Sequence, residues 1–147
     1  MARALELAKE ADQKGEVPVG ALLVSENQIV AEGFNQVELT QSVSAHAEML
    51  VLKEAAKKLA NWRLEGCILY STLEPCVMCA SAIRMSRVSK VVYGAPDIRL
   101  GGFGSLVDLS PMTVFGKPPE VLSGVFAEES AELLKAFFRA RRNEEES

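Results

Sequence analysis

The chain has 147 residues, of which 48% are hydrophobic and 24% are charged, and its formal net charge is −4. This length and composition predict one globular domain over residues 1–147 with a sizeable core. The negative charge excludes strong, indiscriminate attraction to polyphosphate, so nucleic-acid binding must use local basic patches. No apolar run has the length of a membrane span, and residues 1–6 are unlike a secretory signal. We therefore expect a cytoplasmic protein that makes no membrane contact.

The first half of the chain predicts a helix, a hairpin and a second helix. Alanines and leucines recur before Gly15 and indicate an opening helix. Residues 17–24 and 29–34 predict two strands, and residues 25–27 predict the turn between them. Residues 45–60 carry apolar side chains at helical spacing and lysines on the other face.

The second half continues to alternate strands with helices. The pattern predicts strands at 67–71, 88–93 and 121–126, a helix at 77–85, a flexible loop at 101–104, and a closing helix carrying Leu133, Leu134, Phe137 and Phe138. Such alternation predicts an α/β fold in which helices cover a central sheet.

The chemistry of the chain centres on its single histidine. His46 stands in the segment His46-Ala47-Glu48, and Cys76 and Cys79 follow in a Pro-Cys-x-x-Cys segment. One imidazole and two thiolates are natural zinc ligands, and three protein ligands leave the fourth position for water. Both segments begin predicted helices, whose positive ends favour thiolates. Zinc brings the pKa of a bound water to about 7, which provides hydroxide at neutral pH. Attack by hydroxide also needs proton transfer, which Glu48, two residues from His46, could supply without binding the metal.

Two other interpretations of these cysteines stay open. Cys76 and Cys79 could form a redox pair, although no proline lies between them. Cys67 could join His46 and both of these cysteines in a closed structural zinc site. The structural site leaves Glu48 unexplained, so the catalytic interpretation accounts for more of the sequence.

Longer segments extend the zinc motif. They are Glu16–Ala21, Gly33–Asn35, Ala45–Glu48, Thr72–Cys79, Ser86–Val88, Tyr93–Ala95, Gly104–Leu106 and Phe137–Arg142. On these segments the chain resembles the bacterial tRNA-specific adenosine deaminases, in the cytidine and deoxycytidylate deaminase superfamily, over nearly its whole length. The His-x-Glu and Pro-Cys-x-x-Cys pair indicates the superfamily, and the later segments indicate the tRNA branch.

This resemblance implies a three-layer α/β/α sandwich with a five-stranded mixed sheet, and a homodimer. It implies a hydrolase acting on a cyclic amidine, which converts adenosine to inosine at the wobble position in the anticodon stem-loop of an arginine tRNA. His46, Cys76 and Cys79 would hold one Zn²⁺ per subunit, and Glu48 would be the catalytic proton shuttle.

The resemblance also implies substrate contacts. The residues expected to bind the substrate are Asn35, Ala47, Val17, Pro18 and Pro75, and the possible RNA contacts are Arg87, Asp97, Arg99, Arg141 and Arg142. Each set has a plainer interpretation, since asparagine often ends a strand in a turn and arginines favour a helix C-terminus. Phe137 and Phe138 either approach the RNA or, as their spacing favours, continue the core face of the last helix.

The match departs from the family near the substrate loops. The family usually carries Asp-Pro-Thr where this chain has Ser42-Val43-Ser44, and Pro96 replaces a charged residue. A deaminase of a free base or nucleoside, such as guanine, is therefore the first alternative, although the Phe-Phe-x-x-Arg-Arg ending argues against it. A non-catalytic, zinc-stabilised RNA-binding subunit is the second, and the presence of Glu48 argues against that.

Overall fold

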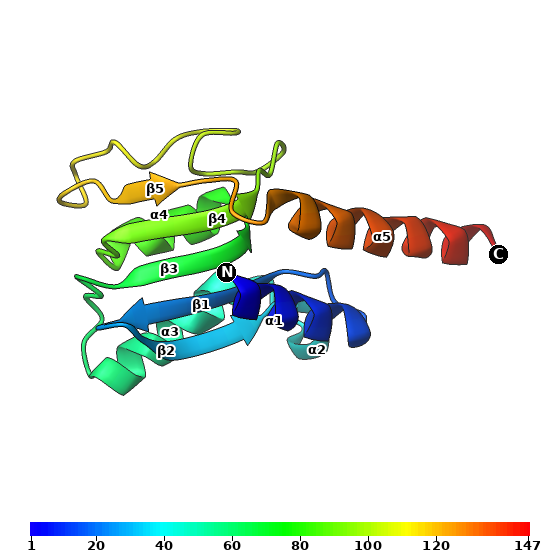
Figure 1. The fold of residues 1–147 in the computed structure, drawn as a ribbon, viewed down its shortest axis with the longest axis horizontal. Helices are drawn as coiled ribbons and strands as arrows, with labels where there is room; N and C mark the ends of the chain where they lie inside the picture. The colour runs from blue at the N-terminus through cyan, green and yellow to red at the C-terminus, as the bar shows by residue number, and fades with distance from the viewer.

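A central sheet of five strands is covered by helices on both faces in the computed structural model, which describes residues 1–147 (Figure 1). The elements in chain order are α1 (Ala2–Gln13), β1 (Gly20–Ser25), β2 (Gln28–Phe34), α2 (Val37–Thr40), α3 (Ala47–Leu59), β3 (Ile68–Leu73), α4 (Val77–Met85), β4 (Lys90–Ala95), β5 (Glu120–Leu122) and α5 (Ala127–Glu146). The strand order is β2-β1-β3-β4-β5. β1 is antiparallel to β2 and β3, whereas β3, β4 and β5 are parallel. The predicted mixed five-stranded sheet is confirmed.

The hairpin of β1 and β2 closes with a two-residue turn. Ser25 pairs with Gln28, and Glu26 and Asn27 have φ angles of 50° and 61°. A turn of this left-handed kind matches the twist of two paired strands, and asparagine tolerates it well. The turn predicted at residues 25–27 is therefore confirmed.

Gly20, the first residue of β1, lies where α1 crosses the sheet. A Cβ at this position would overlap the Ala4 carbonyl oxygen and lie 2.7 Å from the Ala8 backbone nitrogen. The missing side chain lets α1 pack directly on the strand, and Ala4 and Ala8 are both fully buried. The strand begins at Gly20, later than the predicted Val17, and residues 17–19 belong to the segment that connects α1 to β1.

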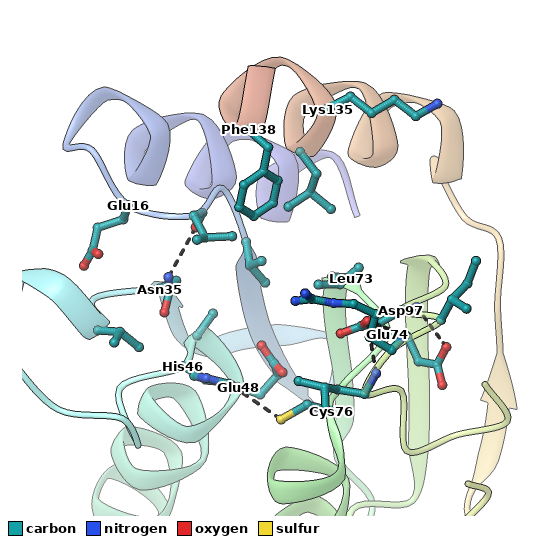
Figure 2. Close-up of a pocket in the computed structure, with 18 of the residues that line it drawn as sticks. Glu16, Asn35, His46, Glu48, Leu73, Glu74, Cys76, Asp97, Lys135 and Phe138 are labelled. Carbon is teal, nitrogen blue, oxygen red and sulfur yellow. Dashed lines mark hydrogen bonds between the residues drawn. The ribbon is translucent and has the colours of Figure 1, made fainter. Parts of the chain in front are cut away.

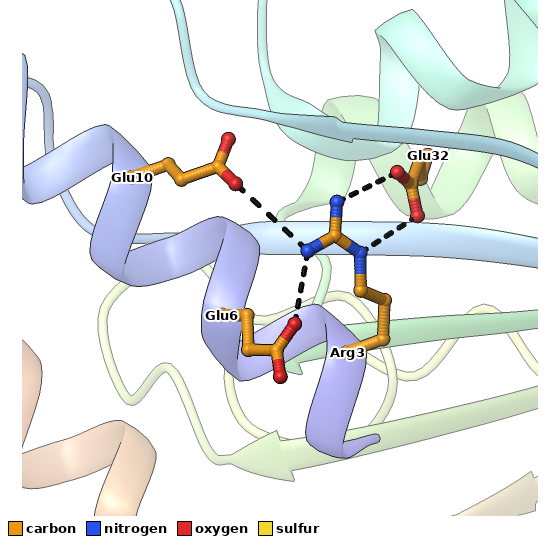
Figure 3. Close-up of polar contacts among 4 residues, drawn as sticks. All are labelled: Arg3, Glu6, Glu10 and Glu32. Carbon is orange, nitrogen blue, oxygen red and sulfur yellow. Dashed lines mark hydrogen bonds and ion pairs between the residues drawn. The ribbon is translucent and has the colours of Figure 1, made fainter.

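An exposed ion-pair cluster also joins α1 to the hairpin (Figure 3). Arg3 donates from Nε and Nη2 to the two carboxylate oxygens of Glu32 on β2, at 3.0 and 2.8 Å. Its Nη1 lies 2.9 Å from Glu6 and 3.8 Å from Glu10, both on α1. The bidentate pair orients the start of α1 against β2. Solvent screening limits how much such an exposed cluster contributes to the free energy of unfolding.

The closing helix α5 begins on the sheet and extends past its edge (Figure 1). At its start the Ser130 hydroxyl donates to the Thr72 carbonyl of β3. Phe137 is 8% exposed, which confirms it as a core residue, but Phe138 is 43% exposed. The prediction that Phe138 is buried was wrong, because Phe138 points to a different side of the helix from Phe137 and lines a cavity. None of the helices combines the length and apolarity of a membrane span.

Three further differences from the predicted elements are local. The short helix α2 was not predicted, and β5 ends at Leu122 because the chain turns toward α5 there. The loop at 101–104 was expected to be flexible, but its first two glycines are buried. Gly102 donates to the Pro75 carbonyl at 2.8 Å, and Gly101 forms an isolated β-bridge with Cys76. These glycines therefore permit close packing rather than motion.

Three loops meet at one edge of the sheet. β2, β3 and β4 point in the same direction, since β1 is antiparallel to both of its neighbours. The carboxyl ends of these strands therefore bring together Asn35, residues 74–76 and residues 96–100. Residues 17–19 enter β1 at the same edge. Ligands commonly bind outside the carboxyl ends of strands in such sheets.

Candidate active site and metal centre

Two helices present their N-termini to this edge. His46 is the N-cap of α3 and Cys76 is the N-cap of α4, and neither side chain caps its own helix. Both side chains therefore stay available to a ligand at positions where the helix dipole is positive. Glu48 lies in the first turn of α3, and Cys79 lies in the first turn of α4. The predicted helix starts at these motifs are confirmed.

The imidazole and the two thiols have the spacing of a zinc site. The ligand atoms of His46, Cys76 and Cys79 all lie within 4.8 Å of one another. His46 Nδ1 is 3.5 Å from Cys76 Sγ and 3.4 Å from Cys79 Sγ. A nitrogen at about 2.0 Å and a sulfur at about 2.3 Å from tetrahedral zinc are about 3.5 Å apart. The three side chains thus fit one zinc ion in the arrangement present.

Cys67 takes no part in this centre. Its side chain is buried just before β3, and its Sγ contacts the Glu65 carbonyl oxygen at 3.9 Å. It is not among the residues whose ligand atoms cluster. The closed structural site that would include Cys67 is therefore wrong, and a fourth metal position stays open on the side of the cavity.

The protonation of the site suits a metal. A hydrogen bond from Cys79, supported by His46, lowers the pKa of Cys76 to about 4. The same bond raises the pKa of Cys79, so the two sulfurs share one proton in the metal-free site. Zinc binding releases that proton, because thiolates are the ligands. Glu48 is 4% exposed, and burial raises the pKa of its carboxyl. A carboxyl of this kind exchanges protons more readily near neutral pH than an exposed one.

The metal centre forms the floor of a cavity of about 800 Å³. Figure 2 shows Glu48 beside His46 and Cys76, with Phe138 pointing toward them from α5 on the opposite side. The predicted site residues that line this cavity are Val17, Asn35, His46, Ala47, Glu48, Cys76, Asp97, Arg99 and Arg142. The structure thus brings together residues from six separate parts of the chain.

Asn35 has an unused polar atom in the cavity wall. The side chain is 8% exposed, and its Nδ2 is 3.5 Å from the Val17 carbonyl oxygen. Its Oδ1 is buried without a hydrogen-bond partner. An unpaired buried acceptor costs free energy, so such an atom indicates that a bound ligand supplies the missing partner.

A family model decides the class of this site. The cytidine and deoxycytidylate deaminase zinc-binding region matches residues 1–95, which include the metal-binding side chains and Glu48. The chain belongs to this deaminase family.

Relatives of the deaminase extend the match over the whole chain. The tRNA-specific adenosine deaminase of Bacillus subtilis (strain 168) is 50% identical over 147 residues, covering 100% of this chain and 91% of that protein. A solved tRNA:A34 deaminase structure, studied for A-to-I editing at the wobble position, has a TM-score of 0.85 at 40% identity, covering 89% of this chain and 95% of that chain. The guanine deaminase of Nitrosomonas europaea has a TM-score of 0.78 at 26% identity, covering 92% and 81%.

Several predicted contact residues of the deaminase do not line the cavity. Pro18 and Pro75 are fully buried, so they shape the backbone of the walls without facing a ligand. Arg87 lines a different groove, between α3 and α4. Arg141 donates to the Gly15 carbonyl, and its guanidinium lies 4.8 Å from the Phe137 ring centroid. Arg141 therefore docks α5 onto the end of α1.

Other residues of the cavity were missed by sequence reasoning as site residues. They include Glu16, Glu74, Leu134 and Lys135. Phe138, for which an approach to the RNA was the less favoured interpretation, and Arg139, a possible phosphate contact, also line the cavity. Glu16 and Glu74 do stand inside the segments that carry the family resemblance. No local signal distinguishes a buried glutamate from an exposed one, so their position required the tertiary structure.

The segment that departs from the family, Ser42-Val43-Ser44, lies outside the cavity lining. It forms a turn before α3 in which the Ser42 and Ser44 hydroxyls are 3.0 Å apart. Val43 is 77% exposed. Pro96, the other departure, does line the cavity. The substitutions at 42–44 therefore leave the described cavity walls intact.

Proposed function

We propose that this deaminase converts adenosine to inosine at the wobble position of transfer RNA. The observation that carries the proposal is a zinc-type ligand set beside a buried glutamate, at the floor of a cavity with a basic rim. The similarity of the full chain to tRNA-specific adenosine deaminases supports the choice of base and of RNA.

The reaction consumes one water and releases ammonia, so protons must move from the water to the base. Zinc, when bound, supplies the Lewis acid that lets water attack carbon at neutral pH. Glu48 takes a proton from the attacking water and delivers it to N1 of adenine. Its carboxylate then assists proton transfer to the departing amino group at C6. Asn35 Oδ1, which has no partner within the protein, accepts a hydrogen bond that helps orient the base.

The rim of the cavity supports an RNA loop as the substrate. Arg99, Lys135, Arg139 and Arg142 are exposed cations along it, although Glu38 and Asp97 lie among them. Exposed Phe138 faces the cavity from α5, the helix that also carries Lys135 (Figure 2). Proteins recognise single-stranded RNA by stacking unpaired bases on aromatic rings and pairing phosphates with cations. An anticodon stem-loop presents such bases, and the similarity to bacterial tRNA-specific adenosine deaminases supports a cytoplasmic location.

The proposal is tested with zinc-loaded protein and an arginine tRNA anticodon stem-loop that carries adenosine at the wobble position. Parallel reactions contain free adenosine, guanine and cytidine, and a control hairpin carries the adenosine one position away. Inosine formed only in the first hairpin is the expected result. Turnover of guanine with an unchanged hairpin would replace the proposal with the free-base alternative.

We also propose that two copies of the deaminase pair through the groove between α3 and α4. Trp62 and Met85 on this groove are 59% and 57% exposed. The groove is lined mostly by apolar side chains, among them Leu52, Ala82 and Phe115. Sedimentation should give a dimer for the natural chain and a monomer for Met85→Glu. A natural chain that sediments as a monomer at micromolar concentration would contradict this pairing.

A further inference from the structure

Two carboxylates in the cavity walls have no part in the chemistry described above. Glu16 is 0% exposed and Glu74 is 1% exposed, and neither forms an ion pair. Burying a carboxylate away from water is costly unless hydrogen bonds replace the lost hydration. The partners of these two groups therefore indicate why they are buried.

Glu74 holds one wall of the cavity. Its Oε1 accepts from the Asp97 backbone N–H at 3.1 Å, and its Oε2 accepts from the Phe103 and Ser105 backbone N–H groups at 3.1 and 3.2 Å. The Ser105 hydroxyl also donates to this carboxylate. A Cβ on Gly101 would overlap Glu74 Oε2, so the loop closes around the carboxylate. Residues 97–100 of this loop line the cavity.

Glu16 holds the wall on the other side of the cavity (Figure 2). Its Oε1 accepts from the Glu38 backbone N–H at 2.9 Å, and its Oε2 accepts from the Leu39 backbone N–H at 3.1 Å. These amides belong to the first turn of α2, whose N-cap makes no side-chain bond of its own. α2 connects Asn35 to the turn before His46, and its residues Val37 and Glu38 line the cavity.

We infer that Glu16 and Glu74 are positioning residues, each fixing one wall of the cavity in the shape that receives the RNA. This inference rests on the proposed function for its substrate. Connecting segments of this kind are ordinarily mobile. Carboxylates that accept several N–H bonds make strong, directional ties, and a wall that is already ordered loses less entropy on binding. The oxygens of both carboxylates are engaged with the protein, so they act on the substrate through the loops.

The test compares Glu16→Gln with Glu74→Gln, since glutamine keeps the shape but turns an NH₂ group toward the N–H donors. Hydrogen exchange should accelerate at residues 97–105 in Glu74→Gln only, and at residues 37–40 in Glu16→Gln only. Each variant is thus the other's control, and Glu65→Gln, on an exposed side chain, should change neither segment. The KM for the hairpin should rise about tenfold or more in both variants, with kcat per bound zinc changing less. Ser105→Ala, which removes one donor from an exposed residue, should give a smaller effect of the same kind.

Three results would overturn the inference. Exchange that rises in both segments in both variants would mean a general loss of stability. Exchange that rises in neither would mean that the carboxylates do not hold the loops. Loosened loops with an unchanged KM would mean that these walls do not bind the substrate. If the natural chain deaminates no hairpin, the proposed function fails, whereas the exchange pattern still decides whether the two carboxylates hold the walls.

Discussion

Replacing Arg139 and Arg142 together with glutamine tests whether the rim of the cavity binds RNA phosphates. Four exposed cations lie along this rim, namely Arg99, Lys135, Arg139 and Arg142. Each phosphate contact to a single strand adds about 0.7 to the slope of log affinity against log salt. If all four engage, the slope is about 2.8 for the natural chain and about 1.4 for the double variant. Raising salt from about 50 to about 200 mM would then weaken binding about fiftyfold in the natural chain and about sevenfold in the variant.

The slope is measured by fluorescence anisotropy of a labelled anticodon hairpin bound to zinc-loaded protein over this salt range. The matched control is Lys57→Gln with Arg63→Gln, which removes the same charge from the last turn of α3 and the segment after it, at the end opposite His46. Turnover at saturating hairpin should change little, because these arginines lie on the rim and not beside Glu48. An unchanged slope in the rim variant, or an equal fall in the control, would refute phosphate binding at this rim.

Three further changes probe the chemistry and the packing. Glu48→Gln should keep zinc and lose about 10²- to 10⁴-fold in kcat, and a variant that keeps its turnover would remove Glu48 from the mechanism. In zinc-free protein, burial raises the pKa of Glu48, so the folded state holds this proton more tightly than the unfolded chain does. The contribution of Glu48 to the free energy of unfolding therefore falls as pH rises from its unfolded-state pKa toward its folded-state pKa. The low pKa of Cys76 acts in the opposite direction in both proteins, so urea unfolding across pH should show stability rising less with pH in the natural chain than in Glu48→Gln. Cys79→Ala should lose bound zinc by metal analysis, and a metal-replete variant would contradict the ligand set. Gly20→Ala should cost about 1–3 kcal/mol because the new Cβ meets the backbone of α1, whereas Gly33→Ala, whose nearest neighbour would be 3.7 Å away, should cost less in the same unfolding assay.

The metal centre was predictable because its parts are local in the chain. His46 and Glu48 stand two positions apart at the start of one helix, and Cys76 and Cys79 stand three apart at the start of another. A helix start orients such neighbours by its own geometry, so residue type and spacing define most of the ligand set. The order of strands and helices was predictable for a similar reason, since apolar periodicity reports which face of each element is buried.

The tertiary structure alone decided which charged and aromatic side chains reach the cavity. Arg141 and Arg142 are adjacent in α5, yet one docks on Gly15 and the other lines the cavity. Phe137 and Phe138 divide in the same way between core and cavity. Adjacent side chains point to different sides of a helix, and contacts with distant residues such as Gly15 decide which side of α5 meets the protein and which meets the cavity.

The sequence by itself therefore indicated the zinc ligands, the neighbouring glutamate and a central sheet covered by helices, and the family resemblance added that the sheet is mixed. The shape of the substrate cavity was decided only in the folded molecule, because two buried carboxylates accept hydrogen bonds from the backbone of its walls. Glu16 and Glu74 bind backbone amides roughly twenty to thirty positions away in the chain. A backbone amide carries no residue-specific pattern in the sequence, so only the fold can show which carboxylate it meets.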